Sequence, residues 1–184
     1  QERLGQRANW KHLTEIMISA AQRLKGGGAE FIVIASNTMN STAHLIENSV
    51  GLPVLHIADS TGARVVERGF SRVGLLGTEY TMAHHFYRER LEHRFGLKIV
   101  TPSKTEREYI NDVIFDELCV GKFLAESKAE FVKIIHRLSR EKNVQAVILG
   151  CTEIPFLVRE KDVEIPLFNT AEIHSEAAVE FSLM

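Results

Sequence analysis

Two stretches with one shared pattern, FIVIASNTMN at residues 31–40 and AVILGCTEIP at residues 146–155, decide the fold of this chain. Each begins with an apolar run typical of a buried strand, at residues 31–35 and 146–150, continues into a tight polar turn and ends where a helix can start. In parallel α/β sheets, ligands bind beyond the carboxyl ends of the strands, where such turns lie. We therefore expect one cleft that the two turns line from two sides.

Strand-like and helix-like segments alternate along the rest of the chain. Apolar runs predict further strands at residues 54–57, 73–77, 97–100 and 165–168, and helical periodicity covers 10–25, 39–48, 59–68, 81–95, 104–120, 125–142 and the chain from 171. This alternation favours parallel sheets built from right-handed crossovers. We predict an α/β fold of two similar lobes, residues 1–58 and 59–170, with parallel sheets flanked by helices and a C-terminal helix, 171–184, packed back on the first lobe.

Composition limits the possible partners. The 184 residues are 45% hydrophobic and 25% charged, which is typical of a soluble globular protein. The net charge of -2, with Lys and Arg spread along the chain, gives no support for nucleic acid or an anionic membrane as a partner. The apolar runs are too short to cross a bilayer, and residues 1–10 carry no secretory signal.

The chain contains two cysteines and opens with a helix. Reduced thiols in a cytoplasmic protein are favoured over a disulfide, because Cys119 and Cys151 lie in very different settings. A helix is an unusual first element for an α/β sheet. We therefore expect that the opening strand of the N-terminal lobe is missing or belongs to a longer gene product.

Cys151 is the strongest candidate for chemistry. It follows a strand end, where the amides of a helix N-terminus favour the thiolate and lower the thiol pKa below its reference of ~8.5. A buried structural cysteine is the alternative, but Thr152 and Glu153 follow at once, which favours the functional interpretation. Cys119 lies in a helical apolar stripe, and we expect it to pack in the core.

Hydroxyl and amide side chains occupy two further strand-end turns. Asn37 and Thr38 supply groups suited to a carboxylate at a helix start, and a purely structural cap has equal support. Thr78 and Thr81 offer the same chemistry, and a plain N-cap at Thr81 is equally acceptable. Lys122 is a candidate cationic anchor for an acidic ligand, although most single lysines are only solvated.

Several common motifs are absent from the sequence. There is no HExxH or CxxC spacing, so a metal site has little support. There is no G-x-G-x-x-G, no G-x-x-x-x-G-K-[ST] and no G-x-S-x-G, which argues against nucleotide binding and against a serine nucleophile elbow.

Seven short motifs carry a family resemblance. The segments NTMN, HIAD, GLLGTEYTM, FYRERL, ELCVGKF, ILGCTEI and PLFNTAEIH have the order and spacing of the aspartate/glutamate racemase family. Over nearly its whole length the chain resembles the bacterial L-aspartate/glutamate-type racemases. This resemblance implies racemisation at Cα of a small dicarboxylic amino acid, in which one residue removes the α-proton and another delivers a proton to the opposite face. It also implies a homodimer that needs no cofactor and no metal.

The resemblance also assigns roles to residues. It makes Cys151 the principal acid/base, and Ser36 stands where the family has its first cysteine. Family positions that hold the substrate carboxylates, border them or supply a cationic anchor correspond to Asn37, Thr38, Thr78, Thr81, Thr152, Glu153 and Lys122.

Three departures from the family pattern bear on activity: Ser36 for cysteine, Asn40 for the usual histidine, and an opening strand and Gly-rich turn of the substrate pocket that do not precede Gln1. Asn169, where relatives often carry Asp, is a milder change. A hydroxyl pKa near water's ~15.7, against ~8.5 for a thiol, opposes ionisation of Ser36 by roughly 10 kcal/mol. Ser36 is therefore a poor base, but it can donate a proton or act through a water. Two alternatives stay open, a one-thiol decarboxylase-like relative that protonates one face and a catalytically impaired dicarboxylate-binding homologue.

Overall fold

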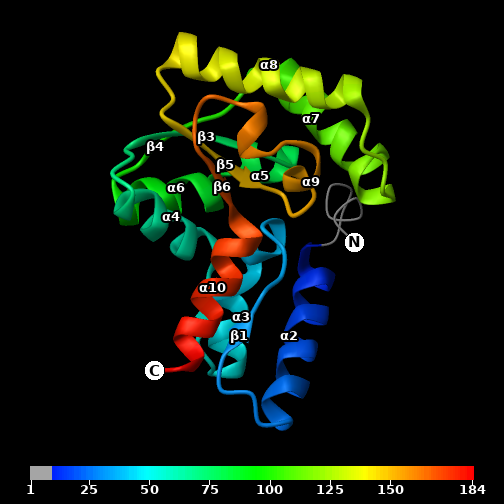
Figure 1. Cartoon of the computed structure of the whole chain (residues 1–184). Helices are drawn as coiled ribbons and strands as arrows, with labels where there is room; N and C mark the ends of the chain where they lie inside the picture. Colours follow the sequence, from blue (N-terminus) through cyan, green and yellow to red (C-terminus); the bar gives the residue numbers. More distant parts are fainter. Residues whose placement is uncertain (1–9) are drawn as a thin grey trace.

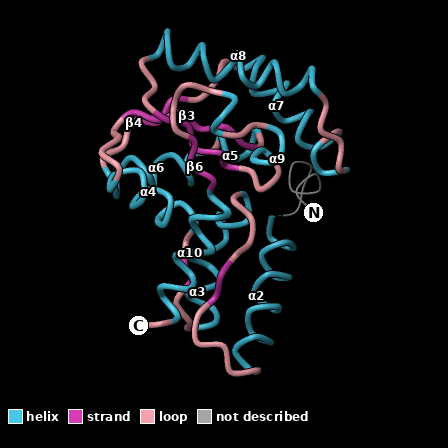
Figure 2. The backbone as a smooth tube through the Cα atoms, viewed as in Figure 1, coloured by secondary structure: helices cyan, strands magenta, loops and turns pink. Residues whose placement is uncertain are grey.

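The computed structural model describes residues 10–184, which form two lobes, each built on its own parallel sheet (Figures 1 and 2). In the first lobe, β1 (Ile32–Val33) pairs with β2 (Val54–Leu55), and the helices α2 (Trp10–Gly26) and α3 (Ala43–Val50) complete it. The apolar stripe of α2 packs there with the inward side chains of β1 and α3. This core consists of Leu13, Ala21, Ile32, Ile34, Met39, Ala43, Ile46 and Val50.

The second lobe holds a four-stranded parallel sheet in the order β4-β3-β5-β6. Its strands are β3 (Arg72–Gly77), β4 (Lys98–Val100), β5 (Ala146–Gly150) and β6 (Leu167–Asn169). The central strand β5 is buried along its whole length, which explains its continuous apolar sequence. The predicted α/β fold with parallel sheets flanked by helices is confirmed.

Short helices connect and cover these strands (Figure 1). The α-helices of this part are α4 (Ile57–Glu67), α5 (Glu79–Ala83), α6 (His85–Phe95), α7 (Lys104–Asp116), α8 (Ala125–Lys142), α9 (Ile154–Leu157) and α10 (Thr170–Ser182). Single 3₁₀ turns occur as η1 (Thr38–Thr42), η2 (Leu118–Val120) and η3 (Glu160–Asp162).

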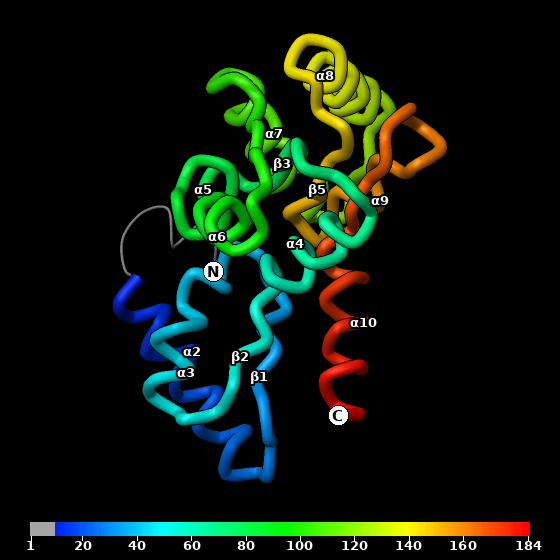
Figure 3. Tube along the Cα trace, turned by 90° about the vertical axis from the view of Figure 1, so that its left-hand side faces the viewer, coloured from blue at the N-terminus to red at the C-terminus, as the bar shows by residue number. Residues whose placement is uncertain are grey.

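The helix α10 starts at the end of β6 and runs along the first lobe (Figures 1 and 3). The ring of Phe181 near its end meets Phe31 edge-on, with ring centroids 4.9 Å apart. Glu176 of α10 forms a salt bridge of 3.0 Å with Arg64 of α4. The last helix therefore ties the end of the second sheet to the first lobe.

Two predicted helices are shorter in the structure than in the sequence analysis. The segment 81–95 is divided into α5 and α6, because His84 takes an extended conformation with ψ of 147°. The helix predicted to reach residue 120 ends at Asp116, and the chain continues through η2. Helical periodicity alone does not register such breaks, since apolar spacing continues across them.

The start of α4 also differs from the prediction. Its N-cap is His56, whose Nδ1 accepts a hydrogen bond of 3.1 Å from the Ala58 amide. Asp59, where the helix was predicted to begin, instead receives two hydrogen bonds of 2.5 and 2.7 Å from Arg90 and one of 2.7 Å from Arg94. The carboxylate therefore fixes α6 against α4.

Gly77 and Gly150 end the two central strands and pair in register. A Cβ on Gly77 would lie 2.7 Å from the carbonyl oxygen of Gly150, a backbone atom that cannot rotate away. Gly77→Ala is therefore expected to lower the free energy of unfolding in urea by roughly 1–3 kcal/mol. Gly26→Ala is the control, because a Cβ there meets nothing within 4 Å. Equal losses in both variants would contradict the role of this close approach.

Candidate active site

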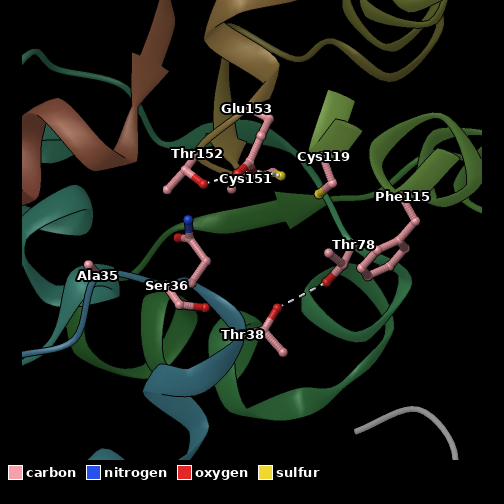
Figure 4. A pocket seen from close by; sticks show the side chains of 11 residues that line it. Ala35, Ser36, Thr38, Thr78, Phe115, Cys119, Cys151, Thr152 and Glu153 are labelled. Atoms are coloured by element: carbon pink, nitrogen blue, oxygen red, sulfur yellow. Dashed lines mark hydrogen bonds between the residues drawn. The ribbon is translucent and has the colours of Figure 1, made fainter. Parts of the chain in front are cut away.

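A cavity of about 440 Å³ lies where the first lobe meets the carboxyl ends of β3 and β5 (Figure 4). The cleft that the sequence analysis expected from two turns is present. In the described part of the chain the cavity is lined by Ala35, Ser36, Asn37, Thr38, Thr78, Phe115, Cys119, Gly150, Cys151, Thr152 and Glu153. This volume suits a small organic ligand.

Asn37 presents a buried acceptor to the cavity. Its Nδ2 donates a hydrogen bond of 2.9 Å to Thr170 Oγ1 at the start of α10. The residue is only 4% exposed, and within residues 10–184 its buried Oδ1 has no hydrogen-bond partner. A buried acceptor without a partner is costly, so this oxygen suits an N–H donor on a bound ligand.

Three threonine hydroxyls, those of Thr38, Thr78 and Thr81, join the two lobes beside the cavity, and we call this contact the seam. Thr38 Oγ1 of the first lobe lies 3.1 Å from Thr78 Oγ1 and 3.2 Å from Thr81 Oγ1 of the second, which are themselves 3.1 Å apart. Thr78 also caps α5, because its hydroxyl accepts from the Thr81 amide at 3.2 Å. Thr38 and Thr78 line the cavity, whereas Thr81 is fully buried behind them.

Cys151 and Glu153 form the chemical centre of the second turn. The Cys151 thiol donates to Glu153 Oε2 at 3.0 Å, and Thr152 Oγ1 donates to the same oxygen at 2.7 Å. The sequence analysis placed the thiol against helix amides, but α9 is only four residues long. The Glu153 carboxylate therefore accepts from both neighbouring side chains and lies directly beside the thiol proton.

Ser36 lies on the first-lobe turn, across the cavity from Cys151 in Figure 4. Its Oγ accepts a hydrogen bond of 3.3 Å from the Met39 amide. A backbone donor at this oxygen stabilises negative charge there when the hydroxyl gives up its proton. Ser36 and Cys151 thus line one cavity from different lobes.

Asn40 ties together the backbone around Ser36. It is 2% exposed, and its Nδ2 donates to the carbonyls of Ile34 at 3.1 Å and Ser36 at 2.7 Å. Its Oδ1 accepts from the Ile57 amide at the start of α4, at 3.2 Å. A histidine, the usual residue in the family by the sequence analysis, cannot donate two bonds from one atom and accept a third. The Asn40 side chain therefore stabilises the backbone around Ser36 through three hydrogen bonds that a histidine could not all form.

Asn40→Ala is expected to lower the free energy of unfolding by roughly 2–4 kcal/mol, because buried backbone groups lose their partners. Asn40→His is expected to destabilise the chain as well, since it restores only part of this network. Urea unfolding checks both, with Asn48→Ala as a control at an exposed asparagine. An Asn40→Ala variant as stable as the original chain would contradict the role of the three bonds.

Cys119 and Phe115 line the cavity, although the sequence analysis did not assign them to the site. The expectation that Cys119 packs in the core is wrong, because its side chain is exposed. The helix ends at Asp116, so η2 turns Cys119 away from the stripe that was extrapolated from α7. The one available signal was the glycine at position 121, which takes a left-handed conformation with φ of 75°.

Lys122 is exposed and is absent from the described cavity lining. Its amide donates to the Glu117 carbonyl at 2.9 Å, which closes the turn after α7.

Within residues 10–184, no three His, Cys, Asp or Glu side chains are grouped as a metal site would require. No helix in that range is long and apolar enough to span a bilayer.

His56, buried where the lobes join, makes stability depend on pH. Burial, followed by the charge of Arg90, lowers the pKa of His56 from 6.5 to about 4. Between pH 6.5 and 4 the unfolded chain therefore binds a proton that the folded chain excludes. Stability from this residue is complete above pH 6.5 and falls by roughly 3 kcal/mol as the pH drops to 4.

Urea unfolding at pH 7 and pH 4 measures this effect. His56→Asn keeps an N-cap acceptor without a titrating ring, so its stability should change less over this range. His93→Asn is the control at an exposed histidine of α6 and should keep the full dependence. The same pH dependence in all three proteins would assign the effect to other groups.

The fold and the cavity define a two-lobed α/β protein with a thiol and hydroxyls at the ends of parallel strands. The family model of the Asp/Glu/hydantoin racemases matches residues 2–178, and the chain belongs to this family.

Solved structures and curated proteins agree with this family. A Yersinia pestis structure, provisionally named an Asp/Glu racemase, is 41% identical with a TM-score of 0.91, over 100% of this chain and 79% of that one. An aspartate racemase homologue from Pyrococcus horikoshii OT3 is 35% identical with a TM-score of 0.86, over 96% and 76%. A glutamate racemase from Koribacter versatilis is 28% identical over 76% of this chain and 47% of its own length. The chain spans about half the length of the curated glutamate racemases it matches.

Proposed function

We propose that the chain racemises aspartate or glutamate without a cofactor, with Cys151 and Ser36 as the two acid/base residues. The observation that carries this proposal is a thiol and a hydroxyl, from different lobes, on one small cavity (Figure 4). Family membership and relatives named as glutamate racemase or aspartate racemase homologue support the same reaction and substrates.

The proton transfers follow from the contacts of the two groups. Glu153 takes the Cys151 proton, and the thiolate then removes the α-proton, leaving the electron pair of the Cα–H bond on carbon. Ser36 donates its hydroxyl proton to the opposite face of Cα. The resulting alkoxide, stabilised by the Met39 amide, takes a proton from water, and Glu153 returns its proton to solvent. The product is the enantiomer of the substrate.

Substrate binding is assigned to the remaining polar groups of the cavity. The Asn37 Oδ1 acceptor suits the substrate ammonium, which carries N–H donors. The hydroxyls of Thr38, Thr78 and Thr152 suit the carboxylates, with Thr81 orienting the first two from behind. Lys122 stays a proposed anchor, which requires its side chain to reach the cavity rim. We further expect a homodimer, which light scattering after size exclusion tests.

Incubation of L-aspartate and L-glutamate in D2O tests the proposal. Racemisation gives the D-isomer with deuterium at Cα, which chiral chromatography and mass spectrometry detect. Deuterated L-isomer alone would support the one-thiol alternative instead. Binding of aspartate in calorimetry without label or inversion would support an impaired binding protein, and the proposed activity would then be rejected.

A further inference from the structure

A second cavity, of about 400 Å³, lies beside the β5–β6 pair, between α4, the segment after α9 and α10. Its apolar wall includes Leu149, Val158 and Phe168, which are almost fully buried. Its charged side chains are three arginines and three glutamates: Arg64, Arg68, Arg159, Glu160, Glu172 and Glu176. None of these residues belongs to the cavity between the lobes.

Of the three arginines, only Arg64 forms a salt bridge within residues 10–184. Arg64 forms salt bridges of 3.2 Å with Glu67 and 3.0 Å with Glu176. Within residues 10–184, Arg68 and Arg159 form no salt bridge, and neither do Glu160 and Glu172. Glu172 Oε2 accepts a hydrogen bond of 3.4 Å from Asn169 Nδ2. The exposed rim of the cavity therefore offers two guanidinium groups and two carboxylates that have no oppositely charged partner in this range.

The guanidinium of Arg68 is held in position by aromatic rings. Its central carbon lies 5.5 Å from the centre of the Phe168 ring and 5.8 Å from that of Phe70. A guanidinium stacked in this way keeps its N–H donors for a carboxylate, which it binds in a fixed geometry. Phe168 thus contributes both to the cavity wall and to the orientation of its cation.

We propose that this second cavity binds a free α-amino acid as an effector. A zwitterion matches the available charges, because its carboxylate suits Arg68 or Arg159 and its ammonium suits Glu160 or Glu172. A simple anion or a simple cation would leave one pair of like charges without a counter-ion. The apolar wall then accepts the side chain of the amino acid.

The two cavities share a wall, which gives the effector a route to the thiol. Leu149 lines the second cavity, and the next two residues, Gly150 and Cys151, line the first. Thr170 Oγ1 donates to the Leu149 carbonyl at 2.8 Å and accepts from Asn37 Nδ2 at 2.9 Å. A ligand that shifts the end of β5 or the start of α10 therefore acts on two walls of the first cavity. This coupling rests on the proposed function, whereas binding does not.

The probe is 2-aminoisobutyrate, an amino acid without an α-hydrogen that no racemase can turn over. Isobutyrate and isopropylamine are its matched analogues without the ammonium and without the carboxylate. In ¹H–¹⁵N spectra of the full chain, 2-aminoisobutyrate should shift the amides of residues 64–68 and 167–173, and each analogue should bind at least tenfold more weakly. Equal binding of all three compounds, no shifts, or shifts confined to residues 36–38 and 150–153 would overturn the proposal.

Variants separate this cavity from the first. The double change Arg68→Gln and Arg159→Gln should weaken binding at least tenfold, and Arg140→Gln, at an exposed arginine of α8, should leave it unchanged. Asn37→Ala should also retain binding. An unaffected double variant would refute the site.

Racemase assays test the coupling separately. The probe should change KM or kcat for aspartate in Arg140→Gln but not in the double variant. Binding without any kinetic effect would remove the effector role. Binding in a chain that shows no turnover would reject the proposed function and keep the site.

Discussion

Cys151→Ala is expected to lower racemisation of aspartate and glutamate by about 10³-fold or more, because it removes the group that takes or gives the α-proton. The loss should appear in kcat more than in KM, since the thiol acts in proton transfer rather than in binding. Initial rates for each enantiomer, followed by circular dichroism of the amino acid, measure it. Deuterium incorporation at Cα should fall with the same factor.

Cys119→Ala is the matched control for this experiment. Cys119 is a second thiol on the same cavity, but it is exposed, whereas Cys151 is buried and donates to Glu153. Its removal should change kcat by less than about tenfold, which is below the usual range for an acid/base group. An inactive Cys119→Ala beside an active Cys151→Ala would reverse the assignment of the thiols.

Ser36→Cys is expected to raise the rate by about 10²-fold for the enantiomer whose α-proton faces the first-lobe turn. In that direction residue 36 must act as a base, and a thiol ionises far more readily than a hydroxyl, by roughly 10 kcal/mol. Only part of this difference is realised, because the Met39 amide already stabilises the alkoxide. The opposite direction, in which residue 36 gives a proton, should change less.

Ser36→Thr is the control, because it keeps a hydroxyl and should change either rate by less than about tenfold. The test uses Ser36→Cys alone, since Asn40→His would also disturb the backbone bonds around residue 36. No gain in either direction from Ser36→Cys would mean that proton transfer at this turn does not limit the reaction. The Cys151 assignment would stand unchanged by that result.

The bounds of elements with long, regular apolar patterns could be predicted from the sequence. The apolar run of β5 and the periodicity of α8 have the predicted bounds, because burial on both faces or on one stripe leaves a clear signature. β1 is only two residues long, and its predicted length of five was wrong. An apolar run records burial, whereas strand length depends on a partner strand for hydrogen bonds.

The site was predictable where its residues lie in consecutive turns. The turns at 36–38 and 150–153 meet as expected, because each follows the carboxyl end of a parallel strand where ligand sites form, although β1 and β5 belong to different sheets. The support from Thr170 and the three bonds of Asn40 are contacts between distant segments, which no local pattern encodes. Cys119 was misplaced for a similar reason, since a helix end changes which way every later side chain points.

The trio of hydroxyls from Thr38, Thr78 and Thr81 has a consequence for motion. Separating two apolar surfaces is unfavourable because it exposes apolar area to water. Each of these hydroxyls, in contrast, can exchange its hydrogen-bond partner for a water molecule at little net cost in free energy. At this seam the three hydroxyl contacts can therefore be replaced by contacts with water without exposing the apolar core of either lobe.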